Sequence, residues 1–139
     1  MSEILNGGYP GIPTPVIENS AVDVRDVAIG HVNALEYPDA KGKRYIISGF
    51  PLENTKVFDI LRQKYGSLGY EICTNPIDAE GIKASGHGPS MRVLGFLGKR
   101  FRVNNSRGIN ELGMKYRTAE ESLIDQAEKQ IELGIVQKK

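Results

Sequence analysis

The sequence predicts a small α/β domain, because helices with clear start signals alternate with short strand-like runs. Thr118-Ala119-Glu120-Glu121 is a capping box, and Asp23 followed by Asp26 has the spacing of an N-cap and its third helical residue. Arg44 to Ser48 form a short run without polar alternation, which is typical of a strand covered on both faces. The chain has 139 residues, 40% apolar and 25% charged, which suits one globular domain with an ordinary core.

Composition narrows the classes of function. The net charge of +1 gives no reason to expect nucleic acid or an anionic membrane as a partner. There is no long apolar run and no signal-like start, so we expect a cytoplasmic protein, with import into an organelle left open. Cys73 with only His31 and His87 is too sparse a set for a structural zinc ion. We therefore predict no metal site.

The first helix is predicted to run from Asp23 to Glu36. Residues 7–20 are rich in glycine and proline and predict an irregular segment, with a short strand at 21–22 leading into the helix. The apolar positions Val24, Val27, Ala28 and Leu35 form one stripe that includes His31. This pattern favours His31 as a buried structural residue over His31 as a general base.

The middle of the chain is predicted from breakers and caps. After the strand at 44–48, a helix over about 54–65 buries Val57, Ile60 and Leu61, with Asn54 or Thr55 as its cap and a stop at residue 66. A weak strand is expected at 70–74, and 75–90 is expected to be a loop with at most one short helix. A further short helix is expected over 91–97.

The last third is predicted as one strand and two helices. Phe101 and Val103 alternate with arginines and predict a half-buried strand. A short helix capped at 105 or 106 then buries Ile109 and Leu112 and ends at residue 113. The capping-box helix places Leu123, Ile124, Ala127 and Ile131 on its apolar side and closes at residue 134.

No catalytic or cofactor-binding residue is predicted. Tyr37 and Lys41 have the Tyr-x-x-x-Lys spacing of a short-chain dehydrogenase, whose mechanism places both residues on one helix. Pro38 and Gly42 put this pair in a loop instead. The glycine pairs 66/69 and 95/98 neither follow a predicted strand nor open a helix, so they predict turns rather than phosphate loops.

The order of these pieces resembles a known family. LNGGYPGIP, VDVRDVAIGHVNALE, GKRYIISG and FRVNNSRGINELGMKYRTAEESLIDQAEKQIELGIV follow one another as in the C-terminal half of extended short-chain dehydrogenases of the dihydroflavonol reductase and cinnamoyl-CoA reductase type, within the NAD-dependent epimerase/dehydratase superfamily. The resemblance implies an α/β fold with one or two strands of the Rossmann sheet and a small mixed lobe, lacking the N-terminal Rossmann half. It departs at 75–95, and the family usually has an acidic residue at Asn104 and alanine at Gly108.

The resemblance also implies a division of the chain and a function. Residues 1–139 form one substrate-lobe domain, with 1–20 bordering the pocket, 21–66 as late Rossmann elements and 67–139 as the small lobe with the C-terminal helices. Tyr9, Ile12 and Ser20 are the implied substrate contacts. The complete family enzyme uses NADP(H) to reduce a carbonyl. This chain alone is expected to bind no cofactor and to be inactive.

The sequence leaves two alternative functions and three alternative partners for this chain. The chain is either the substrate lobe of such a reductase or a non-catalytic structural or binding subunit of a larger assembly derived from one. Its partner would be the Rossmann half, another protein subunit or a second copy of itself. The unalternated strand at 45–48 supports a partner, because such a strand needs neighbours on both sides.

Overall fold

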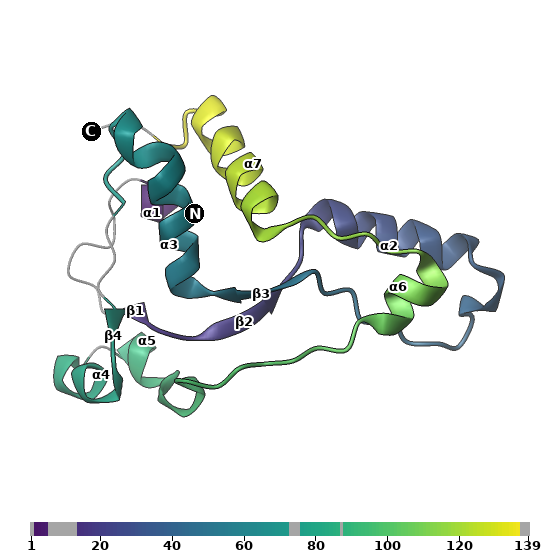
Figure 1. Ribbon diagram of the computed structural model, residues 1–139, viewed down its shortest axis with the longest axis horizontal. Helices are drawn as coiled ribbons and strands as arrows, with labels where there is room; N and C mark the ends of the chain where they lie inside the picture. The colour runs from purple at the N-terminus through teal and green to yellow at the C-terminus, as the bar shows by residue number, and fades with distance from the viewer. Residues whose placement is uncertain (1, 6–13, 73–75, 87, 137–139) are drawn as a thin grey trace.

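The fold is an elongated arrangement of helices around two very small sheets (Figure 1). The computed structural model describes residues 2–5, 14–72, 76–86 and 88–136. The helices are α1 (Ser2–Leu5), α2 (Val24–Glu36), α3 (Asn54–Tyr65), α4 (Ala79–Ser85), α5 (Gly88–Met91), α6 (Ser106–Leu112) and α7 (Ala119–Glu132), with 3₁₀ turns η1 (Pro38–Ala40), η2 (Gly66–Leu68) and η3 (Leu94–Phe96). The strands are β1 (Thr14–Pro15), β2 (Glu18–Ala21), β3 (Phe50–Glu53) and β4 (Pro76–Ile77).

The strands pair into two separate sheets in the described part of the chain. β1 and β4 are parallel, with Thr14 opposite Pro76, and β2 and β3 are antiparallel, with Ala21 opposite Phe50. Asn54 ties the two sheets to α3, because its Oδ1 accepts from the Ile17 main-chain N–H at 3.1 Å and its amide donates to the Pro15 carbonyl. Asn54 therefore does not cap α3, whose N-cap residue, Glu53, makes no side-chain capping bond.

The main core lies between α3 and α7, which run next to each other in Figure 1, and α1, which contacts α7. Tyr65 of α3 packs edge-on against Tyr70, with ring centroids 5.8 Å apart, and its hydroxyl donates to the Ile124 carbonyl of α7 at 3.3 Å. Tyr70 and Ile72 are buried here. The members of this core are Leu5, Phe58, Leu61, Tyr65, Tyr70, Ile72, Ala127 and Val136.

A second packing region joins α2, α6 and the extended segment 43–49. A Cβ at Gly30 would lie 3.0 Å from Ile47 Cδ1 and 3.5 Å from Met114 Cε, so the missing side chain lets both residues approach α2. A Cβ at Gly108 would likewise lie 3.3 Å from the Tyr116 hydroxyl and 3.4 Å from the Ile46 carbonyl. This close approach gives a reason for glycine at 108, where the resembled family usually has alanine.

Two predicted helix starts are confirmed. The Asp23 carboxylate accepts from the Arg25 main-chain N–H at 2.9 Å, at the beginning of α2. At α7 the Thr118 hydroxyl accepts from the Glu121 N–H at 3.1 Å, while the Glu121 carboxylate accepts from the Thr118 N–H at 2.8 Å. Leu123 and Ala127 lie on the buried side of α7, as the apolar pattern predicts.

The predicted apolar stripe of α2 is wrong. Val24 and Leu35 are 78% and 88% exposed, and His31 lies on the surface, where its Nδ1 donates to the Val27 carbonyl at 2.8 Å. The buried side of α2 is instead centred on Asp26 and Gly30. Sequence reasoning chose the more apolar of two possible faces, and tertiary packing uses the other one.

Three predicted strands differ from the structure. Residues 43–48 join no strand ladder among the described residues, so the predicted doubly covered strand at 44–48 has no sheet around it here, and only the Gly49 N–H that follows donates to the Ala21 carbonyl of β2, at 2.9 Å. Residues 70–72 are also without a ladder, and 73–75 lie outside the described residues. Phe101 and Val103 are 40% and 39% exposed, close to the predicted half-burial, but they show no strand pairing among the described residues. In each case the local pattern was strand-like, but sheet formation depends on a neighbouring strand.

The segment 75–90 contains more helix than predicted. α4 begins at Asp78, whose carboxylate accepts from the Gly81 N–H at 2.8 Å, and α5 follows it. Further on, α6 ends at Gly113 as predicted, but Ile109 is exposed, and neither Asn105 nor Ser106 caps the helix. The Asn104 side chain accepts from the Ser106 N–H instead, at 3.0 Å.

Candidate functional site

Of the three residues predicted to contact substrate, only Ser20 lies within the described part of the chain. Tyr9 and Ile12 lie outside the described residues, and Ser20 lies on the exposed part of β2. Ser20 lines a small cavity of about 210 Å³ where β2 and β3 meet the extended segment 101–105. The lining consists of Ser20, Ser48, Gly49, Phe50, Pro51, Phe101, Arg102, Val103 and Asn105.

The lining of this Ser20 cavity combines hydroxyl groups with aromatic and aliphatic side chains. The Ser20 and Ser48 hydroxyls hydrogen-bond to each other, and the Asn105 amide donates to the Ser48 carbonyl at 2.6 Å. Arg102 extends toward β2 and pairs with Glu18 at 3.1 Å. Because the two hydroxyls bond to each other, one O–H remains as a donor between aromatic and aliphatic side chains, which suits a small molecule with one polar group, such as a carbonyl, and an apolar remainder.

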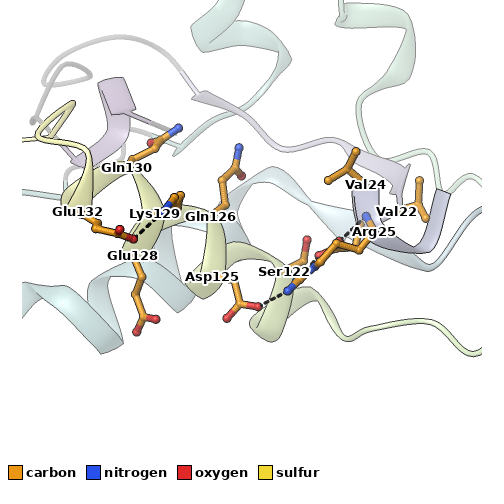
Figure 2. Close-up of a pocket in the computed structure, with 11 residues that line it drawn as sticks. Val22, Val24, Arg25, Ser122, Asp125, Gln126, Glu128, Lys129, Gln130 and Glu132 are labelled. Carbon is orange, nitrogen blue, oxygen red and sulfur yellow. Dashed lines mark hydrogen bonds and ion pairs between the residues drawn. The ribbon is translucent and has the colours of Figure 1, made fainter. Parts of the chain in front are cut away.

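A larger cavity of about 740 Å³ lies between the start of α2 and one side of α7 (Figure 2). Figure 2 shows Arg25 reaching from α2 to Asp125 on α7, and Lys129 pairing with Glu132. Arg25 contacts Asp125 at 2.7 Å and Asp23 at 2.7 Å, so its guanidinium is engaged on both sides. Because both basic side chains of this cleft are paired with carboxylates, it does not present the free positive charge that an anionic ligand needs.

The two aspartates of the VDVRD stretch have structural roles. The Arg25 side chain, together with its main-chain N–H and the Ser122 hydroxyl, holds the pKa of the Asp23 carboxyl well below its usual range against the effect of burial. Asp26 is fully buried and pairs with Arg117, whose main-chain N–H donates to it at 2.8 Å. Asp23, through Arg25 and Ser122, therefore connects the start of α2 to α7. Asp26 connects α2 to Arg117, which lies just before α7. Neither is placed as a general acid or base.

Tyr37 and Lys41 do not form a helical pair. Tyr37 ends α2, and Lys41 follows η1, in agreement with the loop predicted there. The neighbouring Tyr45 hydroxyl instead donates to Glu111 at 2.7 Å, beside Lys43, which contacts the same carboxylate at 2.9 Å. Burial and this bond to Glu111 raise the pKa of Tyr45. A proton-donating tyrosine of a reductase needs the opposite shift.

The two glycine pairs of the described chain do not lie where a dinucleotide phosphate loop would. A dinucleotide site needs a glycine-rich turn between a strand and the N-terminus of a helix. Gly66 and Gly69 bound the 3₁₀ turn η2 at the end of α3, and Gly95 and Gly98 lie in and after η3. Neither pair has that placement.

In the same described ranges, no three His, Cys, Asp or Glu side chains gather as metal ligands, and no helix is long and apolar enough to cross a membrane.

Sequence reasoning missed the link between Asp26 and Arg117. These residues are 91 positions apart, so no local spacing could join them. No local signal identified the pair, because an acidic residue at the third helical position also fits an ordinary helix start without a partner. The sequence also predicted only one described residue of the cavity around Ser20, because Ser48 and Asn105 line it from distant segments.

This chain is similar in sequence or in fold to part of the length of several known proteins. No family model matches the sequence. Over 74 residues the chain is 31% identical to a putative NADPH-dependent methylglyoxal reductase of Candida albicans. The structure is similar to that of Gre2 from Candida albicans in complex with NADPH, with 25% identity and a TM-score of 0.62 over 88% of this chain.

The similarity is partial in length. A nucleoside-diphosphate-sugar epimerase of Pseudomonas aeruginosa shares the fold over 98% of this chain, with a TM-score of 0.71 and 20% identity. The chain spans 22% of the methylglyoxal reductase, 32% of the Gre2 chain and 42% of the epimerase chain. The predicted resemblance and fold class are therefore confirmed: the chain has the α/β fold of the C-terminal part of these proteins.

Proposed function

We propose that this chain is the substrate lobe of an NADPH-dependent carbonyl reductase and that it does not catalyse the reaction by itself. The observation that carries the proposal is the partial match to a methylglyoxal reductase and to Gre2 bound to NADPH, which leaves about two thirds of the Gre2 chain without a counterpart. In the complete enzyme NADPH supplies the hydride. This cofactor would be bound by the nucleotide-binding half of the enzyme.

The Ser20 cavity supports a substrate role for the lobe. Its hydroxyls and the Asn105 amide lie beside Phe50 and Phe101, a combination that can orient a small aldehyde or ketone. Tyr9 and Ile12 belong to the same proposal, because the resembled family places their stretch at the pocket. In this role the lobe positions the carbonyl, and the proton donor comes from the nucleotide-binding half.

The test is an NADPH oxidation assay with methylglyoxal. The full chain alone should show no oxidation above buffer. Co-expression with the part of Candida albicans Gre2 that it does not match should restore oxidation, and Ser20→Ala together with Ser48→Ala should raise KM with less effect on kcat. Oxidation by the chain alone, or a normal KM in the double variant, would contradict the proposal.

A non-catalytic subunit is the second candidate. It is favoured by the exposed apolar side of α2, which gives a docking surface whether or not a reaction takes place. Purification of the native chain with its bound partners separates the two candidates. A co-purified protein that binds NADPH supports the reductase lobe, and a partner without a nucleotide site supports the subunit.

A further inference from the structure

The positive charges of this chain are unevenly distributed. Residues 81–110, here called the basic segment, contain no aspartate or glutamate, whereas all 17 acidic residues and 12 of the 18 basic residues lie outside this range. The overall net charge of +1 therefore conceals a segment with six positive charges. A local cluster of charge attracts ligands of opposite sign even where the whole protein is nearly neutral. The basic residues of the segment are Lys83, Arg92, Lys99, Arg100, Arg102 and Arg107.

Most of these charges have no carboxylate partner. Arg102 pairs with Glu18 at 3.1 Å, and Arg107 lies 3.7 Å from Glu111. The other four basic side chains are exposed, and no carboxylate of the described residues lies within ion-pair distance of them: Lys83, Arg92, Lys99 and Arg100. Unpaired guanidinium and ammonium groups suit phosphate oxygens, because each group donates several charge-assisted hydrogen bonds.

Two aromatic rings accompany these charges on the surface. Phe96 of η3 and Phe101 are 46% and 40% exposed, and their ring centroids are 5.8 Å apart. The chain turns between them at Gly98, whose φ of +68° suits glycine, and the Lys99 N–H donates to the Phe96 carbonyl at 3.1 Å. The two rings are therefore joined by a loop that carries Lys99 and Arg100.

The basic segment also lies apart from the main core. In Figure 1 the chain after α5 runs along the edge of the molecule opposite α3 and α7. Met91 and Val103, which flank the aromatic pair in the sequence, are 40% and 39% exposed. A group of exposed apolar side chains marks an interaction site more often than a single one does. This surface therefore differs from a charged segment that is only solvated.

We propose that the basic segment binds single-stranded nucleic acid. Arg92, Lys99 and Arg100 contact phosphates, and the rings of Phe96 and Phe101 stack on bases. Proteins that bind single strands without sequence preference combine these two kinds of contact, because phosphates recur along the strand and every base has a planar face. The inference goes beyond the proposed function, since it concerns a ligand other than a carbonyl substrate.

A single strand fits this surface better than other polyanions do. An amphipathic helix that lies on an anionic membrane needs several turns, whereas α5 and η3 have four and three residues. An acidic protein segment would satisfy the charges but would offer no regular series of planar rings to Phe96 and Phe101. In a double helix the base faces are already stacked on one another, so the phenylalanine rings would contribute little.

The test is fluorescence anisotropy of the full 139-residue chain with a labelled oligouridylate of about 16 nucleotides. Saturable binding is expected, and its affinity should fall by about tenfold or more between about 50 and about 200 mM salt, because each phosphate contact releases counterions. Lys99→Gln with Arg100→Gln should weaken binding by about tenfold or more. The matched control, Lys56→Gln with Lys64→Gln, removes two exposed charges from α3 and should leave the affinity unchanged.

Phe96→Leu tests the stacking contact separately from charge. Leucine keeps an apolar side chain at this exposed position but has no planar ring, so the affinity for the oligouridylate should fall by about fivefold or more. Phe96 is chosen rather than Phe101, because Phe101 also lines the Ser20 cavity. An affinity equal to that of the wild type would contradict base stacking.

Three further results would overturn the proposal. The first is no saturable binding of the oligouridylate, and the second is equal weakening of binding by the two double variants. The third is equal affinity for a duplex of the same length, whose bases are already stacked. Binding to vesicles that contain phosphatidylserine, without binding to the oligouridylate, would assign the basic segment to a membrane surface instead. Circular dichroism of each variant confirms that the chain is folded when the affinities are compared.

Discussion

Asp26 on α2 is fully buried and holds Arg117 twice, through the Arg117 main-chain N–H at 2.8 Å and through its guanidinium. The contact joins two segments that are 91 residues apart and lies just before the capping box of α7. It therefore fixes where the chain between α6 and α7 crosses α2. A buried carboxylate in this position is a structural element, since removing either partner leaves a polar group without its bond.

We predict that Asp26→Ala lowers the free energy of unfolding by about 2–4 kcal/mol, because it removes an ion pair and leaves a main-chain N–H unpaired. The matched control is Asp125→Ala, which removes an exposed ion pair with Arg25 and should change stability by about 0–1 kcal/mol. Urea denaturation of both variants measures the difference. Equal effects in the two variants would show that Asp26 is not a structural link.

Thr118→Ala should destabilise the protein by about 1 kcal/mol, because the hydroxyl accepts from the Glu121 N–H at the start of α7. Ser106→Ala serves as the control, since Ser106 makes no capping bond at α6. Melting temperatures of both variants test the difference. A Thr118 variant that melts at the wild-type temperature would remove Thr118 as the cap.

Stability should fall at acid pH through Asp23 and Glu121. The Arg25 side chain lowers the pKa of Asp23, and the main-chain N–H of Thr118 lowers the pKa of Glu121. In the unfolded chain the pKa of Asp23 is about 3.9 and that of Glu121 about 4.3. As the pH falls below these values, the unfolded chain binds more protons than the folded chain. Their contribution is therefore complete above about pH 5 and is lost as the pH falls through the folded values.

Unfolding free energies measured from pH 7 to pH 3 test this acid dependence. Asp23→Asn should flatten the decrease below about pH 4, because the substituted amide has no proton to gain. A decrease of the same steepness in the variant would assign the acid sensitivity to other carboxylates.

His31→Gln should change the free energy of unfolding by about 0.5 kcal/mol or less, because the imidazole is exposed and makes one bond to the Val27 carbonyl of its own helix. The stripe predicted from sequence would have made this a destabilising substitution. Thermal unfolding decides between the two: a large loss of stability would return His31 to the core.

Local signals predicted the parts of this fold that depend on neighbours in sequence. The caps at Asp23 and Thr118 and the stop at Gly113 involve residues within a few positions, so the sequence specifies them directly. Asn54 shows the limit, because its side chain has the chemistry of a cap but bonds instead to Pro15 and Ile17. Local spacing identifies a capable side chain, and tertiary structure selects its partner.

The sequence predicted neither the buried face of α2 nor the full set of residues that line the Ser20 cavity. The apolar stripe of α2 is exposed, and Ile47 and Met114 approach the opposite face at Gly30, so hydrophobic periodicity identified the wrong side of the helix. Ser20 was predicted as a pocket residue from resemblance, but its neighbours Ser48 and Asn105 come from other segments. Their meeting depends on the pairing of β2 with β3, which no spacing of residues encodes.

The most direct test of the central claim is a fluorescence titration of the full chain alone with NADPH. If the chain is a substrate lobe that depends on a separate nucleotide-binding half, the titration should show no saturable binding. The described residues offer no glycine-rich turn between a strand and a helix for the phosphates. Saturable binding at micromolar NADPH would contradict the account, because the chain would then contain its own cofactor site.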